Sequence, residues 1–321
     1  MSQAAVSDYI PVSVSTLLPA EEAGIAFYQR DDSGENYVLY CADDLPLLEE
    51  NLNRLRARGV KQLFIEGHAR DSYQEYLRGM IESGPSDEVS GEARAGALNH
   101  VMLDVLESSF RGGDTNETVS AAMQLGSMTA DIVCCDQFAA GDLFKVLHHD
   151  YATFTHSANV ALYAGMLAKE MGLSEKEVQQ ITTGGLLHDL GKLEIDDKIL
   201  SKPGKLDESE FRAIKMHPTR GLNQVSFRKD LNEGQLMMVY QHHERLDGRG
   251  YPVGVAEDEI HLWAKICAVV DVFEALTSHR SYRSPMAKPR VLELMNNDSG
   301  KAFDPEILAC WVKITHAFWA V

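Results

Sequence analysis

The C-terminal half of this 321-residue chain contains two stretches that decide its interpretation, HDLGK at residues 188–192 and HHERLDGRGYP at residues 242–252. Each stretch begins with two adjacent residues that can ligate a metal ion, His–Asp in the first and His–His in the second. Imidazole and carboxylate ligands suit first-row metals such as Mn, Fe, Co, Ni or Zn. Neighbouring side chains on a helix diverge by about 100°, so adjacent ligands are more readily explained by two ions than by one.

Three residues outside these stretches fit the same kind of site. His156 lies on the first expected helix of the C-terminal region, and His217 is expected to end a later helix. Asp271 lies in the middle of an apolar helical stretch, where an aspartate is costly unless it is paired or ligates a metal. Sites with two metal ions are suited to in-line displacement at phosphorus. The candidate ligands are His156, His188, Asp189, His217, His242, His243 and Asp271.

The segments that carry these residues have the pattern of amphipathic helices. Ser174–Glu177 and Asp207–Glu210 each match a capping box, in which two side chains satisfy free N–H groups at a helix start. The last segment, residues 305–321, is expected to turn Ile307, Leu308, Trp311 and Ile314 inward on one helical face. Residues 147–321 are therefore expected to form an all-α helical bundle.

The N-terminal residues 1–84 have a different pattern, which predicts a small mixed α/β domain. The expected strands are residues 10–14, 24–28, 37–40 and 62–65, and the expected helices are residues 43–58 and 71–82. This region contains no nucleophile motif, metal-ligand spacing or phosphate-binding loop. A sensory or regulatory role and a structural or dimerising role are both open. The whole chain is expected to belong to the α+β class.

Residues 85–146 are interpreted as a helical linker between these two domains. Residues 84–91 are polar and contain Gly, Pro and Ser, which is typical of a connecting segment. Residues 91–110 and 116–138 have helical patterns, separated by Gly112–Gly113. Helical connectors of this kind often carry dimer contacts, so a homodimer is an expectation by analogy.

The composition limits the partners and the compartment. The formal net charge of −18 argues against binding to polymeric nucleic acid or to an anionic membrane through bulk charge. The five cysteines include no C-x-x-C pair, as expected for reduced thiols in a reducing compartment. The N-terminus lacks the pattern of a signal peptide, and no run of eighteen apolar residues occurs. A soluble cytoplasmic protein is expected.

The order of the motifs resembles the HD-GYP subgroup of the HD superfamily of metal-dependent phosphohydrolases. The resemblance also includes DVFEALTS at residues 271–278, RSYR at residues 280–283 and FDP at residues 303–305. It covers residues 147–321 and implies a helical catalytic domain that hydrolyses the cyclic dinucleotide c-di-GMP to linear pGpG, and in some members on to GMP. Proteins with GGDEF domains are suggested partners in this family.

The resemblance implies a role for each matching residue. The seven candidate ligands would hold two divalent ions, most often Fe, Mn or Ni, with Asp189 bridging them. Lys192 would reach the scissile phosphate, so that Asp189 and Lys192 are the expected catalytic residues. Lys192, Tyr251, Arg280 and Arg283 would bind the substrate: arginine offers a planar fork for phosphate or guanine, and Tyr251 would line the pocket.

One departure from the family pattern and two alternatives bear on this interpretation. Some members have a glutamate four residues before the first ligating histidine, where it helps to hold a third metal, but here that position is Ala152. A binuclear site is therefore expected. The first alternative is a non-hydrolysing receptor for c-di-GMP or for a partner protein. The second is a phosphodiesterase for another cyclic or linear dinucleotide.

Overall fold

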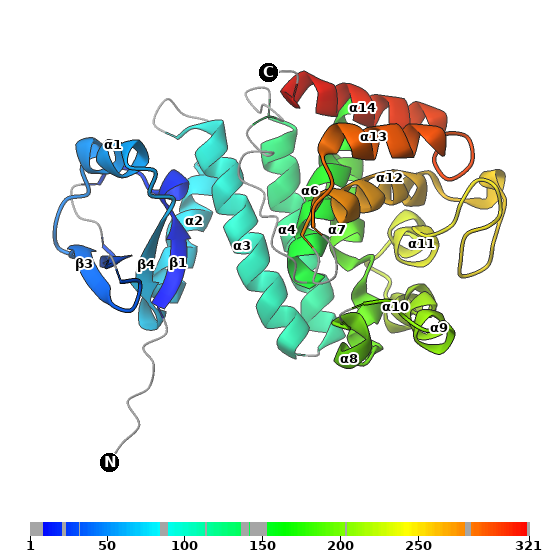
Figure 1. Ribbon diagram of the computed structural model, residues 1–321, viewed down its shortest axis with the longest axis horizontal. Helices are drawn as coiled ribbons and strands as arrows, with labels where there is room; N and C mark the ends of the chain where they lie inside the picture. Colours follow the sequence, from blue (N-terminus) through cyan, green and yellow to red (C-terminus); the bar gives the residue numbers. More distant parts are fainter. Residues whose placement is uncertain are drawn as a thin grey trace, which may run out of the picture. The chain divides into compact units, whose positions relative to one another are not determined.

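The computed structural model describes residues 9–20, 24–31, 33–83, 89–112, 114–135, 141, 153–202, 204–279 and 284–319. Helices predominate, and one small antiparallel sheet lies in the N-terminal part of the chain (Figure 1). At this level the structure confirms the expected α+β class. The chain divides into two compact units, residues 1–101 and residues 102–321. No helix among the described residues is long and apolar enough to cross a bilayer.

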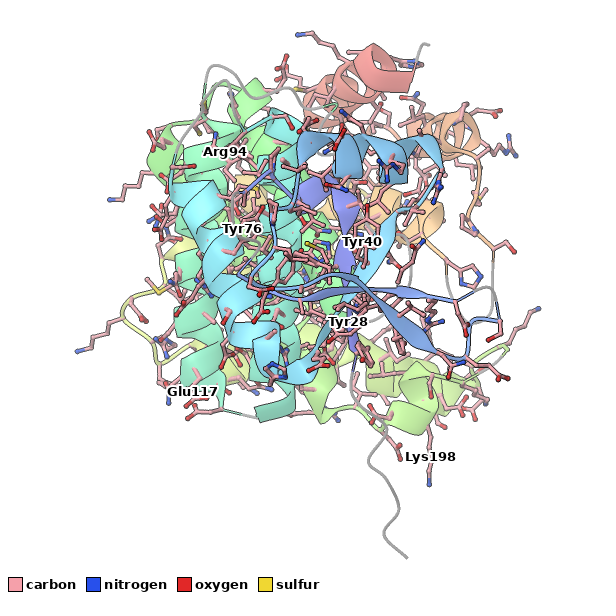
Figure 2. All side chains as sticks on the ribbon, turned by 90° about the vertical axis from the view of Figure 1, so that its left-hand side faces the viewer. Tyr28, Tyr40, Tyr76, Arg94, Glu117 and Lys198 are labelled. Carbon is pink, nitrogen blue, oxygen red and sulfur yellow. The ribbon has the colours of Figure 1, made fainter. Side chains whose placement is uncertain are left out.

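The N-terminal unit is built around a four-stranded sheet with the strand order β1-β4-β2-β3. Its elements are β1 (Tyr9–Ser13), β2 (Phe27–Arg30), β3 (Tyr37–Cys41), α1 (Glu49–Ala57), β4 (Gln62–Glu66) and α2 (Arg70–Glu82). Alternate residues of the sheet, among them Val12, Leu63 and Ile65, are fully buried and form the core of the unit. Figure 2 labels Tyr28 and Tyr40 on the sheet and Tyr76 on α2.

Two of the predicted elements in this unit begin later than expected. The second strand begins at Phe27, because Gly24 has a positive φ of 68°, which an extended strand does not allow. The first helix begins at Glu49 instead of Asp43, because Leu47 exchanges two backbone hydrogen bonds with Ala20. Pro46 also disfavours helical backbone at the residue before it.

Both helices expected in the linker, residues 85–146, are present, as α3 (Gly91–Gly112) and α4 (Thr115–Val133). The prediction extended the second of them to residue 138, but α4 ends at Val133. The Lys169 ammonium donates hydrogen bonds to the carbonyls of Val133 and Cys135, and so satisfies acceptors that a continuing helix would use. Residues 84–88 of the expected connecting segment lie outside the described residues.

The remaining helices are those expected of the C-terminal region, coloured green to red in Figure 1. They are α6 (Thr153–Glu170), α7 (Glu175–Leu187), α8 (Asp197–Leu200), α9 (Glu208–Lys215), α10 (His217–Val225), α11 (Glu233–Gln241), α12 (Leu262–Thr277), α13 (Lys288–Asn297) and α14 (Pro305–Trp319). Both predicted capping boxes are present, at Ser174 and at Asp207. Tyr163, Phe273 and Trp311 meet edge to face in the core, with ring centroids 5.1–5.9 Å apart.

His217 was predicted to end a helix, and this prediction is wrong. It begins α10, with Pro218 in the first turn of that helix. Proline lacks an N–H group and is therefore tolerated where a helix starts but not where it continues. The chain ends α9 at Lys215 and starts α10 two residues later, which turns the His217 side chain into the interior.

Candidate metal centre

The seven predicted ligands come from helix ends and helix faces that converge in the C-terminal unit. His156 lies on α6, His188 caps the end of α7 with Asp189 next to it, and His217 begins α10. His242 caps the end of α11 with His243 next to it, and Asp271 lies within α12. All are buried except His243, whose side chain is 24% exposed. Six of the seven side chains are thus shielded from solvent, and one opens to it.

The structure brings all seven residues together in two groups. One group contains Asp189, His217, His242 and His243, and the other contains His156, His188 and Asp271. Within each group every residue offers a ligand atom, and these atoms lie within 4.8 Å of one another. Each group could therefore hold one ion, with imidazole and carboxylate donors that suit a first-row metal.

The Asp189 carboxylate lies between the two groups. Its Oδ1 atom lies 3.2 Å from His217 Nε2 and 3.8 Å from His242 Nε2. Its Oδ2 atom lies 3.4 Å from His188 Nε2 and 3.5 Å from His156 Nε2. Each oxygen of one carboxylate therefore faces the histidines of a different group.

Backbone carbonyl groups orient three of the histidines. The Nδ1 atoms of His188, His217 and His242 lie 2.7, 2.8 and 2.9 Å from the carbonyl oxygens of Gly185, Ile214 and Met238. A carbonyl oxygen only accepts, so Nδ1 carries a proton in each ring, and in a neutral imidazole the lone pair then lies on Nε2. This is the tautomer that a metal ligand needs, and each Nε2 atom points toward Asp189.

His156 is oriented by a carboxylate instead of a carbonyl group. Its Nδ1 atom makes a short hydrogen bond to Glu274 Oε2, and its Nε2 atom lies 3.1 Å from Asp271 Oδ1. The other oxygen of Glu274 accepts hydrogen bonds from Asn159 Nδ2 at 3.1 Å and from Ser278 Oγ at 2.6 Å. Glu274 gained no role from the sequence, although it lies one helical turn after Asp271 in the same apolar stretch, which is a signal that could have identified it.

The electrostatics of the site keep the carboxylates ionised and two of the imidazoles neutral. Burial raises the pKa of Asp189, but the charge of Lys192 outweighs it and holds that pKa well below its usual range. Burial likewise opposes ionisation of Asp271, and its hydrogen bond to His156 reverses this, so its pKa is also lowered. Burial lowers the pKa of His243 to about 3 and that of His242 well below its ordinary value.

His156 behaves differently, because acidic groups surround it. Burial lowers its pKa, but the charge of Glu274 and the hydrogen bond to Asp271 outweigh burial and raise the pKa to about 9. Two buried atoms, His188 Nε2 and Asp189 Oδ1, have no hydrogen-bond partner among the described residues. Buried polar atoms are rarely left without a partner, and each of these two carries a lone pair that a metal ion would accept. The residues therefore fit a pair of metal ions.

Lys192 connects the centre to a cavity. Its Nζ atom lies 2.5 Å from Asp189 Oδ2, and its side chain is 15% exposed. The cavity has a volume of about 600 Å³ and continues from Lys192 along α8 and α9. Its lining combines the apolar side chains Ile199, Leu200, Leu206, Phe211 and Ile214 with three lysines, Lys192, Lys202 and Lys205, and two acidic residues, Asp207 and Glu208.

Tyr251 borders the centre on its solvent-accessible side. Its ring stacks on the His243 imidazole with the centroids 4.6 Å apart. Glu244, which the sequence analysis did not single out, holds the loop after it by accepting backbone hydrogen bonds from Val253 and Gly254. A side chain at Gly250 would place its Cβ atom 2.5 Å from Glu244 Cα, so only glycine fits there. Arg280, Arg283 and Ala152 lie outside the described residues.

Comparisons with known proteins agree with this geometry. A model of the HD domain family matches residues 145–307. The cyclic di-GMP phosphodiesterase PA4108 of Pseudomonas aeruginosa is 29% identical over 83% of this chain and 67% of that protein. The cyclic di-GMP phosphodiesterase response regulator RpfG of Xanthomonas campestris is 39% identical over 66% of this chain and 61% of that protein.

Two further similarities concern a related group of enzymes and the fold. The 3'3'-cGAMP-specific phosphodiesterase 3 of Vibrio cholerae is 38% identical over 50% of this chain, which spans 35% of that protein. An HDG"Y"P protein from Bdellovibrio bacteriovorus has a similar structure, with a TM-score of 0.66 and 21% identity over 96% of this chain and 99% of that chain. The family match covers half of the sequence and includes all seven candidate ligands, and the chain therefore belongs to the HD domain family.

Proposed function

We propose that the protein is a metal-dependent phosphodiesterase that hydrolyses c-di-GMP to pGpG and possesses two metal ions in its active site. The observation that carries the proposal is the position of Asp189, whose two oxygens face the histidines of two separate groups. A carboxylate placed in this way is suited to bridge two ions. Relatives named cyclic di-GMP phosphodiesterases in Pseudomonas and Xanthomonas support the choice of substrate.

The proposed mechanism assigns a task to each part of the centre. The seven ligands would hold the ions, with Asp189 shared between them. When bound, two such ions supply hydroxide near neutral pH and neutralise charge on a phosphate group. Lys192 supplies a fixed positive charge beside Asp189, where it would stabilise the negative charge that develops on the reacting phosphate.

The cavity beside Lys192 is the proposed place for one half of the substrate. Its apolar side chains, such as Leu200 and Phe211, would contact a base, and Lys192 and Lys205 would offset the negative charge of the ligand. These local cations allow an anionic ligand to bind although the whole chain carries a net charge of −18. Tyr251 would line the pocket on its other side, and Arg280 and Arg283 would hold phosphate or guanine.

The finer features of the proposal come from the family resemblance. Two ions are proposed in place of three because Ala152 stands where some members have a glutamate. Fe, Mn and Ni all suit the ligand set. Hydrolysis would yield pGpG and, to the extent that pGpG also binds, GMP.

The experiment that tests the proposal combines metal analysis with product analysis. Protein purified without oxygen is assayed for bound metals, and c-di-GMP and 3'3'-cGAMP are each followed by chromatography with added Mn²⁺ or Fe²⁺. Two metals per chain and conversion of c-di-GMP to pGpG are expected, and Asp189→Asn should remove the activity. If the protein binds c-di-GMP but forms no product, the proposed enzymatic activity would be refuted, and a receptor function would be favoured.

A second candidate function has its own support. Relatives named 3'3'-cGAMP-specific phosphodiesterases in Vibrio cholerae are 38% and 42% identical over about half of this chain. The same experiment distinguishes the two candidate functions. If 3'3'-cGAMP is turned over faster than c-di-GMP, 3'3'-cGAMP is the preferred substrate.

The organisation and setting of the protein are proposed on the same basis. Residues 1–84 would form a regulatory domain and residues 85–146 a linker that carries a homodimer contact, with the phosphodiesterase in residues 147–321. Five free cysteines fit a reducing cytoplasm, where the substrate is made and degraded. A GGDEF-domain protein is a proposed partner. Polymeric nucleic acid and membrane surfaces are not proposed as partners.

A further inference from the structure

Lys215 is a cation beside the candidate centre to which neither the sequence analysis nor the mechanism gives a role. It is the last residue of α9, two residues before the ligand His217. Its Nζ atom lies 4.8 Å from the centroid of the Phe211 ring and 5.3 Å from that of the Tyr251 ring. The two rings belong to different segments, and a cation within about 6 Å of an aromatic ring is attracted to its face. The ammonium is therefore positioned from two sides.

The charge of Lys215 is not neutralised by a carboxylate. Among the described residues it forms no ion pair, in contrast to other lysines of this unit. Lys192 lies 2.5 Å from Asp189, and Lys202 lies 2.6 Å from Glu210. Aromatic rings hold a cation without cancelling its charge, so Lys215 remains able to bind an anion.

The position of Lys215 relative to the centre is also defined. The Tyr251 ring stacks on the His243 imidazole at 4.6 Å, and the ammonium lies 5.3 Å from that same ring. The sum of these two distances sets an upper limit of about 10 Å on the separation of Lys215 Nζ from the centroid of the His243 ring. Lys192 contacts the oxygen of Asp189 that faces His156 and His188, whereas Tyr251 borders His217 and His243. The two lysines therefore lie beside different ligand groups.

We propose that Lys215 binds the second, unreacted phosphate of a cyclic dinucleotide while the first phosphate lies at the metal centre. The inference rests on the proposed function and adds a determinant of substrate class. A cyclic dinucleotide carries two phosphodiester groups, each with one negative charge, and only one of them is cleaved at a time. A cation held to one side of the reacting position selects such a ring over a ligand with a single phosphodiester.

The alternative role for Lys215 is structural. Its contacts with Phe211 and Tyr251 join α9 to the loop that contains the GYP sequence, and this alone would explain its position. A structural role and a phosphate-binding role predict different results for substrates of different charge. Loss of a structural contact displaces Tyr251 for every substrate, whereas loss of a phosphate contact affects only those with a second phosphate.

The experiment compares Lys215→Met, which keeps the length of the side chain, with Lys215→Arg, which keeps the charge. Each variant is assayed with c-di-GMP and with bis(p-nitrophenyl) phosphate, a diester with a single phosphate. For Lys215→Met, KM for c-di-GMP is expected to rise roughly 10- to 100-fold with little change in kcat. The ratio of kcat/KM for c-di-GMP to that for the chromogenic diester should fall by at least tenfold, and Lys215→Arg should restore most of it.

Lys198→Met is the matched control, because it removes the same charge from an exposed side chain that projects away from the ribbon in Figure 2. Equal losses on both substrates, or an unchanged KM for c-di-GMP, would overturn the role of Lys215. If the wild type binds c-di-GMP without cleaving it, the proposed function fails. The role of Lys215 is then tested by comparing the Kd for c-di-GMP of the wild type with that of the same variants. If the wild type neither binds nor cleaves a cyclic dinucleotide, both proposals fall.

Discussion

Replacement of Glu274 by glutamine tests how the protein prepares His156 for a metal ion. The buried carboxylate accepts a hydrogen bond from His156 Nδ1 on one oxygen and from Asn159 and Ser278 on the other. Glutamine has the same shape but offers an N–H₂ group in place of one oxygen. If this group faces His156, Nδ1 must accept a hydrogen bond, and the proton that the ring keeps then lies on Nε2, the atom that would ligate the metal. If the N–H₂ group of the glutamine faces Asn159 instead, it meets the side-chain N–H₂ group of Asn159, and two donors face each other without an acceptor.

The size of the effect follows from the kind of hydrogen bond that is lost. A hydrogen bond to a charged group contributes about 1.5–3 kcal/mol. This corresponds to roughly 10- to 160-fold in a binding constant, and changes in residues that orient metal ligands cost about 10- to 100-fold in metal affinity. His156 belongs to the group with His188 and Asp271, so the loss should fall on one ion only.

The assay is a titration of metal-free protein with Mn²⁺, followed by the electron paramagnetic resonance signal of the free ion. Glu274→Gln should weaken one of two sites by about 10- to 100-fold and change the other by less than about threefold. Ser278→Ala keeps the carboxylate and should have a smaller effect, and Glu177→Gln at the exposed capping box should have none. Equal weakening of both sites, or no change in either, would refute the proposed orientation of His156.

Three further substitutions separate the parts of the centre. Asp189→Asn should abolish turnover and reduce bound metal below two ions per chain, because its carboxylate faces both groups of candidate ligands. Elemental analysis measures the metal content, and an unchanged content would contradict a shared ligand. Lys192→Met should retain both ions but lower kcat, and loss of metal would show that it only supports Asp189. Gly250→Ala should lower the thermal midpoint by forcing the backbone away from Glu244, at a cost of about 1–3 kcal/mol; an unchanged Tm would mean that the loop adapts freely.

The grouping of the seven candidate ligands could be predicted from the sequence because each residue contributes its own chemistry. Paired residues such as His188–Asp189, and an aspartate inside an apolar helix at position 271, are conspicuous in a sequence and are all brought together in the structure. Glu274 and Glu244 were missed because their importance lies in what they contact. Glu274 matters through the ring of His156, which lies 118 residues earlier, and no periodicity indicates such a contact.

The errors in the fold have a different cause, since they all concern helix and strand boundaries. Pro218 indicates a break in the helix, but it does not say whether His217 lies before or after that break. The pairing of Leu47 with Ala20 delays α1, and depends on a residue 27 positions away. The start of α1 is thus decided by long-range backbone hydrogen bonds, which patterns along the chain do not contain.

The two groups of candidate ligands differ in charge, and this would make two ion sites there unequal. His242 and His243 bring neutral rings to one site together with the imidazole of His217, and Asp189 supplies the only carboxylate of this group. The other site has Asp271 as a ligand and shares the second oxygen of Asp189, and its His156 is hydrogen bonded to Glu274. An ion surrounded by more negative charge is held more tightly but polarises its other ligands less. The site of these three histidines, which Tyr251 borders, is therefore the one where an ion would draw most strongly on a phosphate oxygen, and Lys215 lies against the same Tyr251 ring.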